Sequence, residues 1–99
     1  MTAEVQDEPD RSRFTARVEG RLAGIAAYEL GEGVVTFTHT VVGDDFEGQG
    51  VGGALARTAL DAARERGLAV VPRCPFIAGW IEHHPDYAAL VLGTSGRGA

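Results

Sequence analysis

The chain has 99 residues, of which 44% are hydrophobic, as is typical of one small globular domain. Its formal net charge is −5 and its nine basic positions are all arginine, which excludes Schiff-base and P-loop lysines and argues against a nucleic-acid partner. No apolar run approaches the roughly 20 residues of a membrane span. The start lacks a signal-peptide pattern and the single cysteine allows no internal disulfide, so we expect a cytoplasmic protein without membrane contact.

The first half of the chain predicts an antiparallel meander. Residues 1–11 are acidic and polar, and we expect them to form a disordered lead. Strands are predicted at residues 13–18, 22–30 and 34–42. Glu19-Gly20 and Gly31-Glu32-Gly33 have the composition of tight turns between consecutive strands, so neighbouring strands are expected to pair.

Alternation along the strand at residues 34–42 predicts two faces. One face carries Val35, Phe37, His39 and Val41, and the other carries Thr36, Thr38, Thr40 and Val42. On this pattern His39 shares a face with Phe37. The role of His39 is either that of a general base or acceptor-orienting group, or that of a structural histidine bonded to a backbone carbonyl.

The second half predicts a helix, a strand and a second helix. The helix spans residues 51–66, with apolar residues at helical spacing and Gly67 as its C-cap. A short strand at 68–72 is expected parallel to the third strand. Pro75 fits the first turn of the next helix, in which Phe76 and Trp80 are interpreted as core. Residues 86–92 form a short helix or strand, a single domain spans 12–92, and 93–99 is expected to be a mobile tail.

A glycine-rich loop lies between the third strand and the first helix. Its residues are Gly48, Gln49, Gly50, Val51, Gly52 and Gly53. Glycine allows sharp turns and close approach of a ligand, while the free N–H groups and dipole of a helix start favour an anion such as phosphate. The loop also fits the dinucleotide pattern G-x-G-x-x-G. That interpretation is disfavoured, because the next strand ends at Pro72-Arg73-Cys74 without the carboxylate that would bind the ribose.

Three motifs occur together at a specific spacing: His39-Thr40 before the loop, G-Q-G-x-G at residues 48–52, and P-R-C-P-F at 72–76. With them, residues 39–87 resemble the cofactor-binding core of the GNAT superfamily of N-acetyltransferases. The segment is most similar to the short single-domain, YjdJ-type subgroup. The resemblance covers about half of the chain. It implies a mixed α+β GNAT-like fold, in which an antiparallel meander is followed by a β-α-β crossover and a C-terminal helix.

The resemblance also implies a function, the transfer of an acetyl group from acetyl-CoA to an amine on a small molecule or a protein, without a metal. Loop amides from Gln49 to Gly53 would bind the pyrophosphate of coenzyme A. Main-chain groups of Val41 and Val42 would pair with the pantetheine arm, and one amide could polarise the thioester carbonyl. Arg57, one helical turn beyond the loop, is either a further phosphate contact or an ordinary surface arginine.

Cys74 and His39 are the candidate catalytic residues. Cys74 follows the strand beside the expected thioester and precedes a helix start, so it accepts an acetyl group, lines the acyl site or is simply a small buried residue. The subgroup often carries an acidic residue where Val41 stands, which leaves His39, a more distant carboxylate or water as base. His83 and His84 are expected at a solvated helix end rather than in a zinc site.

Glu47 stands where the superfamily usually has Arg, Gln or Lys. Its carboxylate would repel a pyrophosphate unless it points to solvent. Together with Val41, this departure keeps a second function open, a non-catalytic acyl-CoA-binding or protein-interaction module. The chain is expected to be a monomer or a homodimer.

Overall fold

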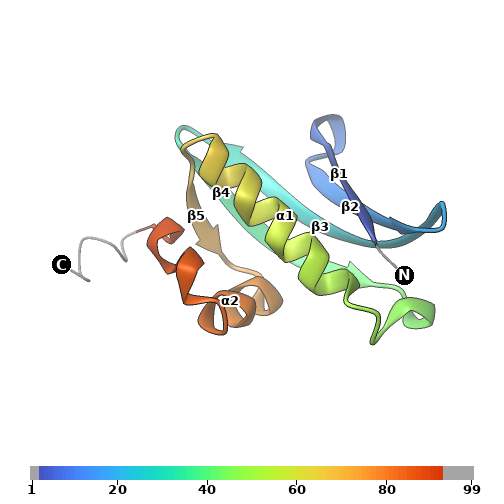
Figure 1. Cartoon of the computed structure of the whole chain (residues 1–99). Helices are drawn as coiled ribbons and strands as arrows, with labels where there is room; N and C mark the ends of the chain where they lie inside the picture. Colours follow the sequence, from blue (N-terminus) through green and yellow to red (C-terminus); the bar gives the residue numbers. More distant parts are fainter. Residues whose placement is uncertain (1–2, 93–99) are drawn as a thin grey trace.

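The computed structural model of the protein, which describes residues 3–92, contains one five-stranded sheet (Figure 1). The strands are β1 (Glu4–Glu8), β2 (Arg13–Val18), β3 (Arg21–Gly31), β4 (Val34–Val42) and β5 (Ala69–Pro72). They follow the chain in order across the sheet, with β1 to β4 antiparallel and β5 parallel to β4. The predicted tail at residues 93–99 lies outside the described residues.

The predicted turns produce the meander. Glu19 and Gly20 join β2 to β3 and have φ values of 53° and 80°, so both lie in the left-handed region that a two-residue hairpin turn requires. Gly33, with φ 72°, serves the turn from β3 to β4. Turn residues that can be recognised in the sequence therefore fix the end of β2, both ends of β3 and the start of β4.

The predicted disordered lead is wrong over β1, which pairs with β2 from Glu4↔Arg17 to Glu8↔Arg13. Two of the acidic side chains that suggested disorder, Asp7 and Glu8, have arginine and tyrosine partners on other elements. Arg13 Nε donates to Glu8 Oε1 at 2.9 Å, and Asp7 accepts hydrogen bonds from Tyr28 and Arg66. These side-chain contacts, together with the pairing to β2, hold β1 in the sheet. A short 3₁₀ helix, η1 (Pro9–Arg11), follows β1.

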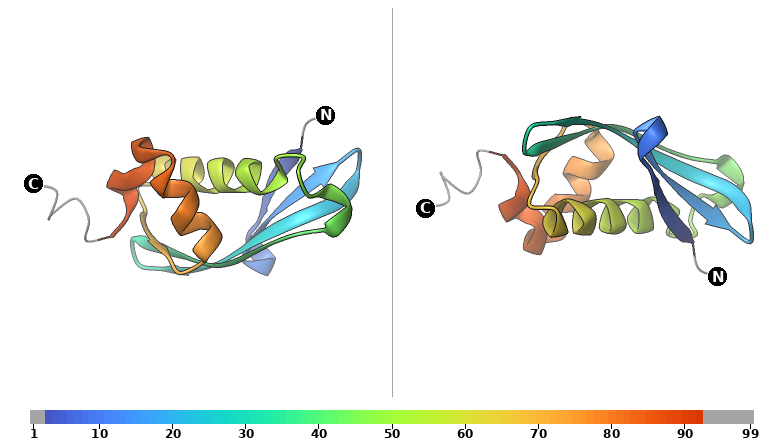
Figure 2. Two further views of the ribbon diagram at one scale, coloured as in Figure 1. Left: turned by 90° about the horizontal axis from the view of Figure 1, so that it is seen from below. Right: turned by 90° about the horizontal axis from the view of Figure 1, so that it is seen from above.

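Two α-helices lie on the same side of the sheet (Figure 2). They are α1 (Val51–Glu65), between β4 and β5, and α2 (Pro75–Glu82). The buried side of α1 carries Val51, Leu55, Ala56, Ala59, Leu60 and Ala63. As predicted, α1 ends just before Gly67, whose φ of 69° suits the turn out of a helix. No helix within residues 3–92 is long and apolar enough to cross a membrane.

The chain after α2 combines both predicted alternatives for residues 86–92. A 3₁₀ helix, η3 (Pro85–Leu90), follows α2. Val91 then forms an isolated parallel bridge with Val70 of β5, and Leu92 N donates to Val70 O at 2.8 Å. These two residues therefore cover part of the outer edge of β5.

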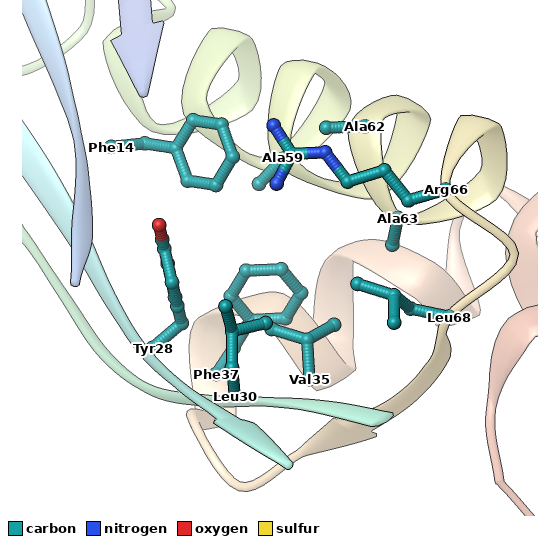
Figure 3. Close-up of a pocket in the computed structure, with 10 residues that line it drawn as sticks. All are labelled: Phe14, Tyr28, Leu30, Val35, Phe37, Ala59, Ala62, Ala63, Arg66 and Leu68. Atoms are coloured by element: carbon teal, nitrogen blue, oxygen red, sulfur yellow. The ribbon is translucent and has the colours of Figure 1, made fainter. Parts of the chain in front are cut away.

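Three aromatic rings meet in the core between the sheet and the last turns of α1 (Figure 3). The ring centroids of Phe14 and Tyr28 are 5.5 Å apart, and those of Tyr28 and Phe37 are 6.4 Å apart. Arg66 extends over the small space between the rings and the helix. The volume of this space is about 10 Å³, room for about one water molecule. This region is therefore packing rather than a ligand site.

Candidate functional site

The site begins where β4 and β5 separate. The two strands pair from Val34↔Ala69 to Phe37↔Pro72, but β4 continues to Val42 while the chain after β5 turns into α2. Cys74 N donates to Phe37 O at 2.9 Å and closes the apex of the opening. From residue 38 to residue 42, one edge of β4 therefore has no strand partner among the described residues.

A β-bulge lies at the same point of β4. Ala27 pairs with His39 and Tyr28 pairs with Phe37, so Thr38 has no residue opposite it. The extra residue reverses the alternation beyond it. Phe37 is 1% exposed and faces the helices, whereas Val41 is 54% exposed on the other face. The predicted common face of Phe37, His39 and Val41 is therefore wrong, because regular alternation does not survive a bulge.

The bulge also decides which main-chain groups face the opening. Gly43 N donates to Ala23 O of β3 at 2.8 Å. Hydrogen-bonded residues alternate along an antiparallel pair, so the register directs the main-chain groups of Val41 toward β3 as well. The N–H and C=O groups of Thr40 and Val42 then point to the edge that β5 has left. The main-chain groups at the open edge are therefore those of Thr40 and Val42, while those of Val41 face β3. The predicted pairing of Val41 and Val42 with the pantetheine arm stays a prediction.

The glycine loop lies at the open end of this gap. Gly48 and Gly50 have φ values of 83° and 81°, and Gly50 is the N-cap of α1. Gln49 N donates to Phe46 O at 3.3 Å, so this amide, predicted to be free, is engaged. The N–H groups of residues 50–53 donate to no backbone or side-chain acceptor within the described part of the chain. Four amides at the start of a 15-residue helix are thus available to an anion.

A hollow of about 270 Å³ lies over the loop. It is lined by Val42, Phe46, Glu47, Gly48, Gly50, Val51, Gly52, Gly53 and Phe76. The loop glycines contribute backbone without side chains, and Glu47 lines the same space as an exposed carboxylate. The predicted loop residues and the end of β4 therefore meet at one place.

Phe76, which the sequence interpretation placed in the core, lies at the surface. Its side chain is 43% exposed and lines the hollow over the loop. Ile77 and Ile81, four residues apart, form the buried side of α2. A residue next to Ile77 lies about 100° around the helix axis from it, so this spacing is the signal that separates Phe76 from the core.

Cys74 lies at the apex of the opening but is only 2% exposed. Its Sγ is 3.3 Å from Oγ1 of Thr40, a contact that links the N-cap of α2 to β4 across the gap. The thiol is therefore held beneath the strand edge and does not stand in the hollow. Its predicted contact with an acetyl group stays a prediction.

His39 is exposed on the face of β4 away from the helices. Its Nδ1 lies 3.2 Å from Thr38 Oγ1, and that hydroxyl also lies 3.4 Å from Ala27 O. The hydroxyl can donate to the carbonyl while it accepts from Nδ1–H, which would leave Nε2 free to accept a proton. The bulge thus places the histidine and the opening on adjacent parts of the same strand.

Arg57 stacks on Trp80 of α2. Its guanidinium carbon lies 5.4 Å from the indole centroid, and Trp80 in turn stacks on His84 with centroids 3.7 Å apart. His83 and His84 are engaged through Nδ1 with backbone carbonyls of α2. The indole ring therefore holds Arg57 beside α2, and the predicted contact of this arginine with a phosphate stays a prediction.

Tyr87 also belongs to the scaffold. Its hydroxyl donates to Asp61 Oδ1 at 2.7 Å, and this hydrogen bond raises the pKa of Tyr87, with burial adding to the effect.

Among residues 3–92, no three His, Cys, Asp or Glu side chains form a group able to hold a metal ion.

The model of the GCN5-related N-acetyltransferase family matches residues 13–90, and the chain belongs to this family. The family predicted from the three sequence motifs is thus confirmed. Protein NATD1 of Gallus gallus is 34% identical over 85 residues, which cover 82% of this chain and 77% of that protein. The assignment to the YjdJ-type subgroup stays a prediction.

Solved structures give the same fold. The solution structure of a GCN5-like protein from Staphylococcus aureus superposes with a TM-score of 0.70 at 26% identity, covering 91% of this chain and 88% of that one. A ribosomal-protein-alanine N-acetyltransferase from Brucella melitensis biovar Abortus 2308 gives a TM-score of 0.54 at 25% identity, with coverages of 82% and 63%. The predicted mixed α+β GNAT-like fold is therefore confirmed.

Proposed function

We propose that the protein binds acetyl-CoA and transfers its acetyl group to an amine. One observation carries the proposal: free amides at the start of α1 open directly beside the unpaired edge of β4. The first feature suits a pyrophosphate and the second suits an extended arm with amide groups. Membership in the GCN5-related family supports acetyl-CoA as the donor.

Each part of the coenzyme has a matching group. The pyrophosphate is assigned to the N–H groups of residues 50–53, where the dipole of α1 favours negative charge. The pantetheine arm is assigned to the main-chain groups of Thr40 and Val42. Glu47 opposes the anion, so the backbone amides must provide most of the attraction. Gly50 lines the hollow without a side chain, and an added Cβ there would meet no protein atom within 4 Å, so the space beside this amide is open.

The proposed acetyl transfer takes place at the same unpaired edge of β4. The amine nitrogen attacks the thioester carbonyl carbon, the carbon–sulfur bond breaks, and coenzyme A leaves as a thiolate that takes a proton. Negative charge develops on the carbonyl oxygen during attack, and a fixed main-chain N–H is most effective there. We assign this donor to Thr40.

His39 is assigned as the base that accepts the proton of the amine, because its ring is exposed and lies on the strand whose edge is assigned to the coenzyme. Cys74 is assigned to the wall of the acyl site. A thiol that is 2% exposed and in contact with Thr40 is poorly placed to attack the thioester itself.

A matched pair of variants tests the loop assignment. A Cβ at Gly53 would meet only Trp80 Nε1, at 3.6 Å, so Gly53→Ala fits the fold. Gly53→Pro adds a ring but removes the N–H, in a helical turn whose amides have no helix partner. We expect Gly53→Ala to bind acetyl-CoA within about twofold of the native chain and Gly53→Pro to lose about tenfold or more, the effect of one hydrogen bond to a charged group.

Isothermal titration calorimetry measures both affinities, and circular dichroism checks that each variant is folded. Equal affinity of the two variants would contradict the role of the Gly53 amide. An acetyl-transfer assay on small amines, peptide N-termini and lysine side chains then tests catalysis. The exposed apolar Val41, which cannot accept a proton, favours the second candidate, a non-catalytic acyl-CoA-binding module. Binding without transfer to any of these acceptors would support that candidate.

A further inference from the structure

Phe76 carries an apolar surface that the fold leaves uncovered. It lies in the first turn of α2, yet 43% of the residue is exposed while Ile77 beside it is fully buried. Its ring lies against Gly52 of α1, where an added Cβ would stand 2.8 Å from the ring atom Cζ. The glycine at position 52 thus leaves the room that the ring occupies, and the free face of the ring borders the hollow over the loop.

The lining of the hollow is chemically mixed. It includes the backbone of the glycine loop with its free amides, the carboxylate of Glu47, and the apolar side chains of Val42, Phe46 and Phe76. The amides suit an anionic group, and the apolar side chains suit a less polar part of the same ligand. The pantetheine arm of coenzyme A, attached to its pyrophosphate, has this character, whereas a nucleotide that ends at the pyrophosphate does not.

We propose that Phe76 is a specificity-determining residue that packs against the pantetheine arm, an inference that rests on the proposed function. An arm that runs from the loop amides to the edge of β4 passes Val42, which lines the hollow together with Phe76. Burial of apolar surface favours binding in proportion to the area covered. Phe76 therefore separates coenzyme A and its thioesters from adenine nucleotides that share the same phosphates.

Calorimetry with two ligands tests this assignment. The ligands are acetyl-CoA and adenosine 3′-phosphate 5′-diphosphate, which has the phosphates without the arm. We expect Phe76→Ala to weaken acetyl-CoA binding about tenfold and Phe76→Leu about two- to threefold, because leucine keeps part of the apolar surface. Both variants should bind the nucleotide within about twofold of the native chain. Leu30→Ala, which removes an exposed apolar side chain that does not line the hollow, is the matched control and should leave both affinities unchanged.

Two results would overturn the assignment and leave the proposed function intact. In one, both Phe76 variants keep the native affinity for acetyl-CoA. In the other, Phe76→Ala weakens the two ligands equally, which would mean that the ring only supports the loop. If the native chain bound neither ligand, the proposed function would fail, and the role of Phe76 would fail with it.

Discussion

Tyr28 connects three elements through one hydroxyl group. The hydroxyl donates to Asp7 Oδ1 of β1 at 2.7 Å, and Arg66 beyond the end of α1 donates to Asp7 Oδ2 at 3.0 Å. The pKa of Tyr28 is raised to about 12, chiefly by burial and also by the hydrogen bond to Asp7 and the charge of Asp7, while the charge of Arg66 opposes the rise. The neutral phenol is therefore the form that the fold requires.

This raised pKa predicts a loss of stability at high pH. The folded pKa lies above the ordinary value of 10, so the contribution of Tyr28 is complete below pH 10 and is lost as the pH rises toward 12. We expect the free energy of unfolding to fall by about 2 kcal/mol over this range, at roughly 1.4 kcal/mol per pKa unit. The chain has no lysine to titrate there. Tyr87, whose pKa is also raised by its hydrogen bond to Asp61, adds to the fall in the same direction and is unchanged in a variant that lacks only the Tyr28 hydroxyl.

Urea denaturation at pH 9.5 and pH 11.5 measures this fall, with Tyr28→Phe as the control. The phenylalanine variant should be less stable at pH 9.5 and should lose clearly less stability between the two pH values. If its stability fell as steeply as that of the native chain, another group would be responsible.

At the residue scale, the sequence predicts the parts of the site that depend on local chemistry. The backbone has positive φ at Gly48 and Gly50. Glycine favours this conformation, so these turns can be predicted from the residues themselves. The pairing of Asp7 with Tyr28 and Arg66 joins residues far apart in the chain, so it could not be predicted. The position of Phe76 could have been inferred from the spacing of Ile77 and Ile81.

At the element scale, the bulge in β4 is the main departure from the predicted pattern. The sequence alternates from Val35 to Val41 without a break, and nothing in it indicates that Thr38 has no partner in β3. The main-chain groups assigned to the coenzyme therefore shift from Val41 to Thr40. Bulges depend on how a strand fits its neighbour, whereas strand limits depend on turn residues, and this is why only the limits could be predicted.

The strand β1 is the second feature that the sequence does not predict. Its removal directly tests what the strand contributes to stability. A chain that starts at Pro9 lacks Asp7 and leaves the Tyr28 hydroxyl and Arg66 without this partner. We expect the free energy of unfolding to fall by about 2 to 4 kcal/mol, since a hydrogen bond to a charged group alone contributes about 1.5 to 3 kcal/mol. Urea denaturation measures the fall.

The single substitution Asp7→Asn is the matched control for the truncation. It keeps β1 and its backbone pairing with β2, so it should lower the free energy of unfolding by less than removal of the strand does. If the truncated chain were as stable as the full one, β1 would contribute nothing, as expected for the disordered lead that the composition suggested.

For the whole molecule, the meander, the crossover and the glycine loop act together. The helices cover one side of the sheet, and α1 begins near the end of β4 (Figure 2). Val42 and the first residues of α1 line one hollow there. The order of elements and the loop could be predicted from turn residues, periodicity and the three family motifs. The gap itself could not, because it depends on where β5 stops pairing with β4.

The central claim is that acetyl-CoA binds along the loop and the open edge of β4. An NMR titration of the ¹⁵N-labelled chain with acetyl-CoA tests it most directly, because each backbone amide reports separately. The account predicts the largest shift changes at the amides of Gly50 to Gly53, Thr40 and Val42, with smaller changes at Val41, whose main-chain groups face β3. Saturating acetyl-CoA that left these loop and strand amides unshifted, or that shifted a different surface instead, would contradict it.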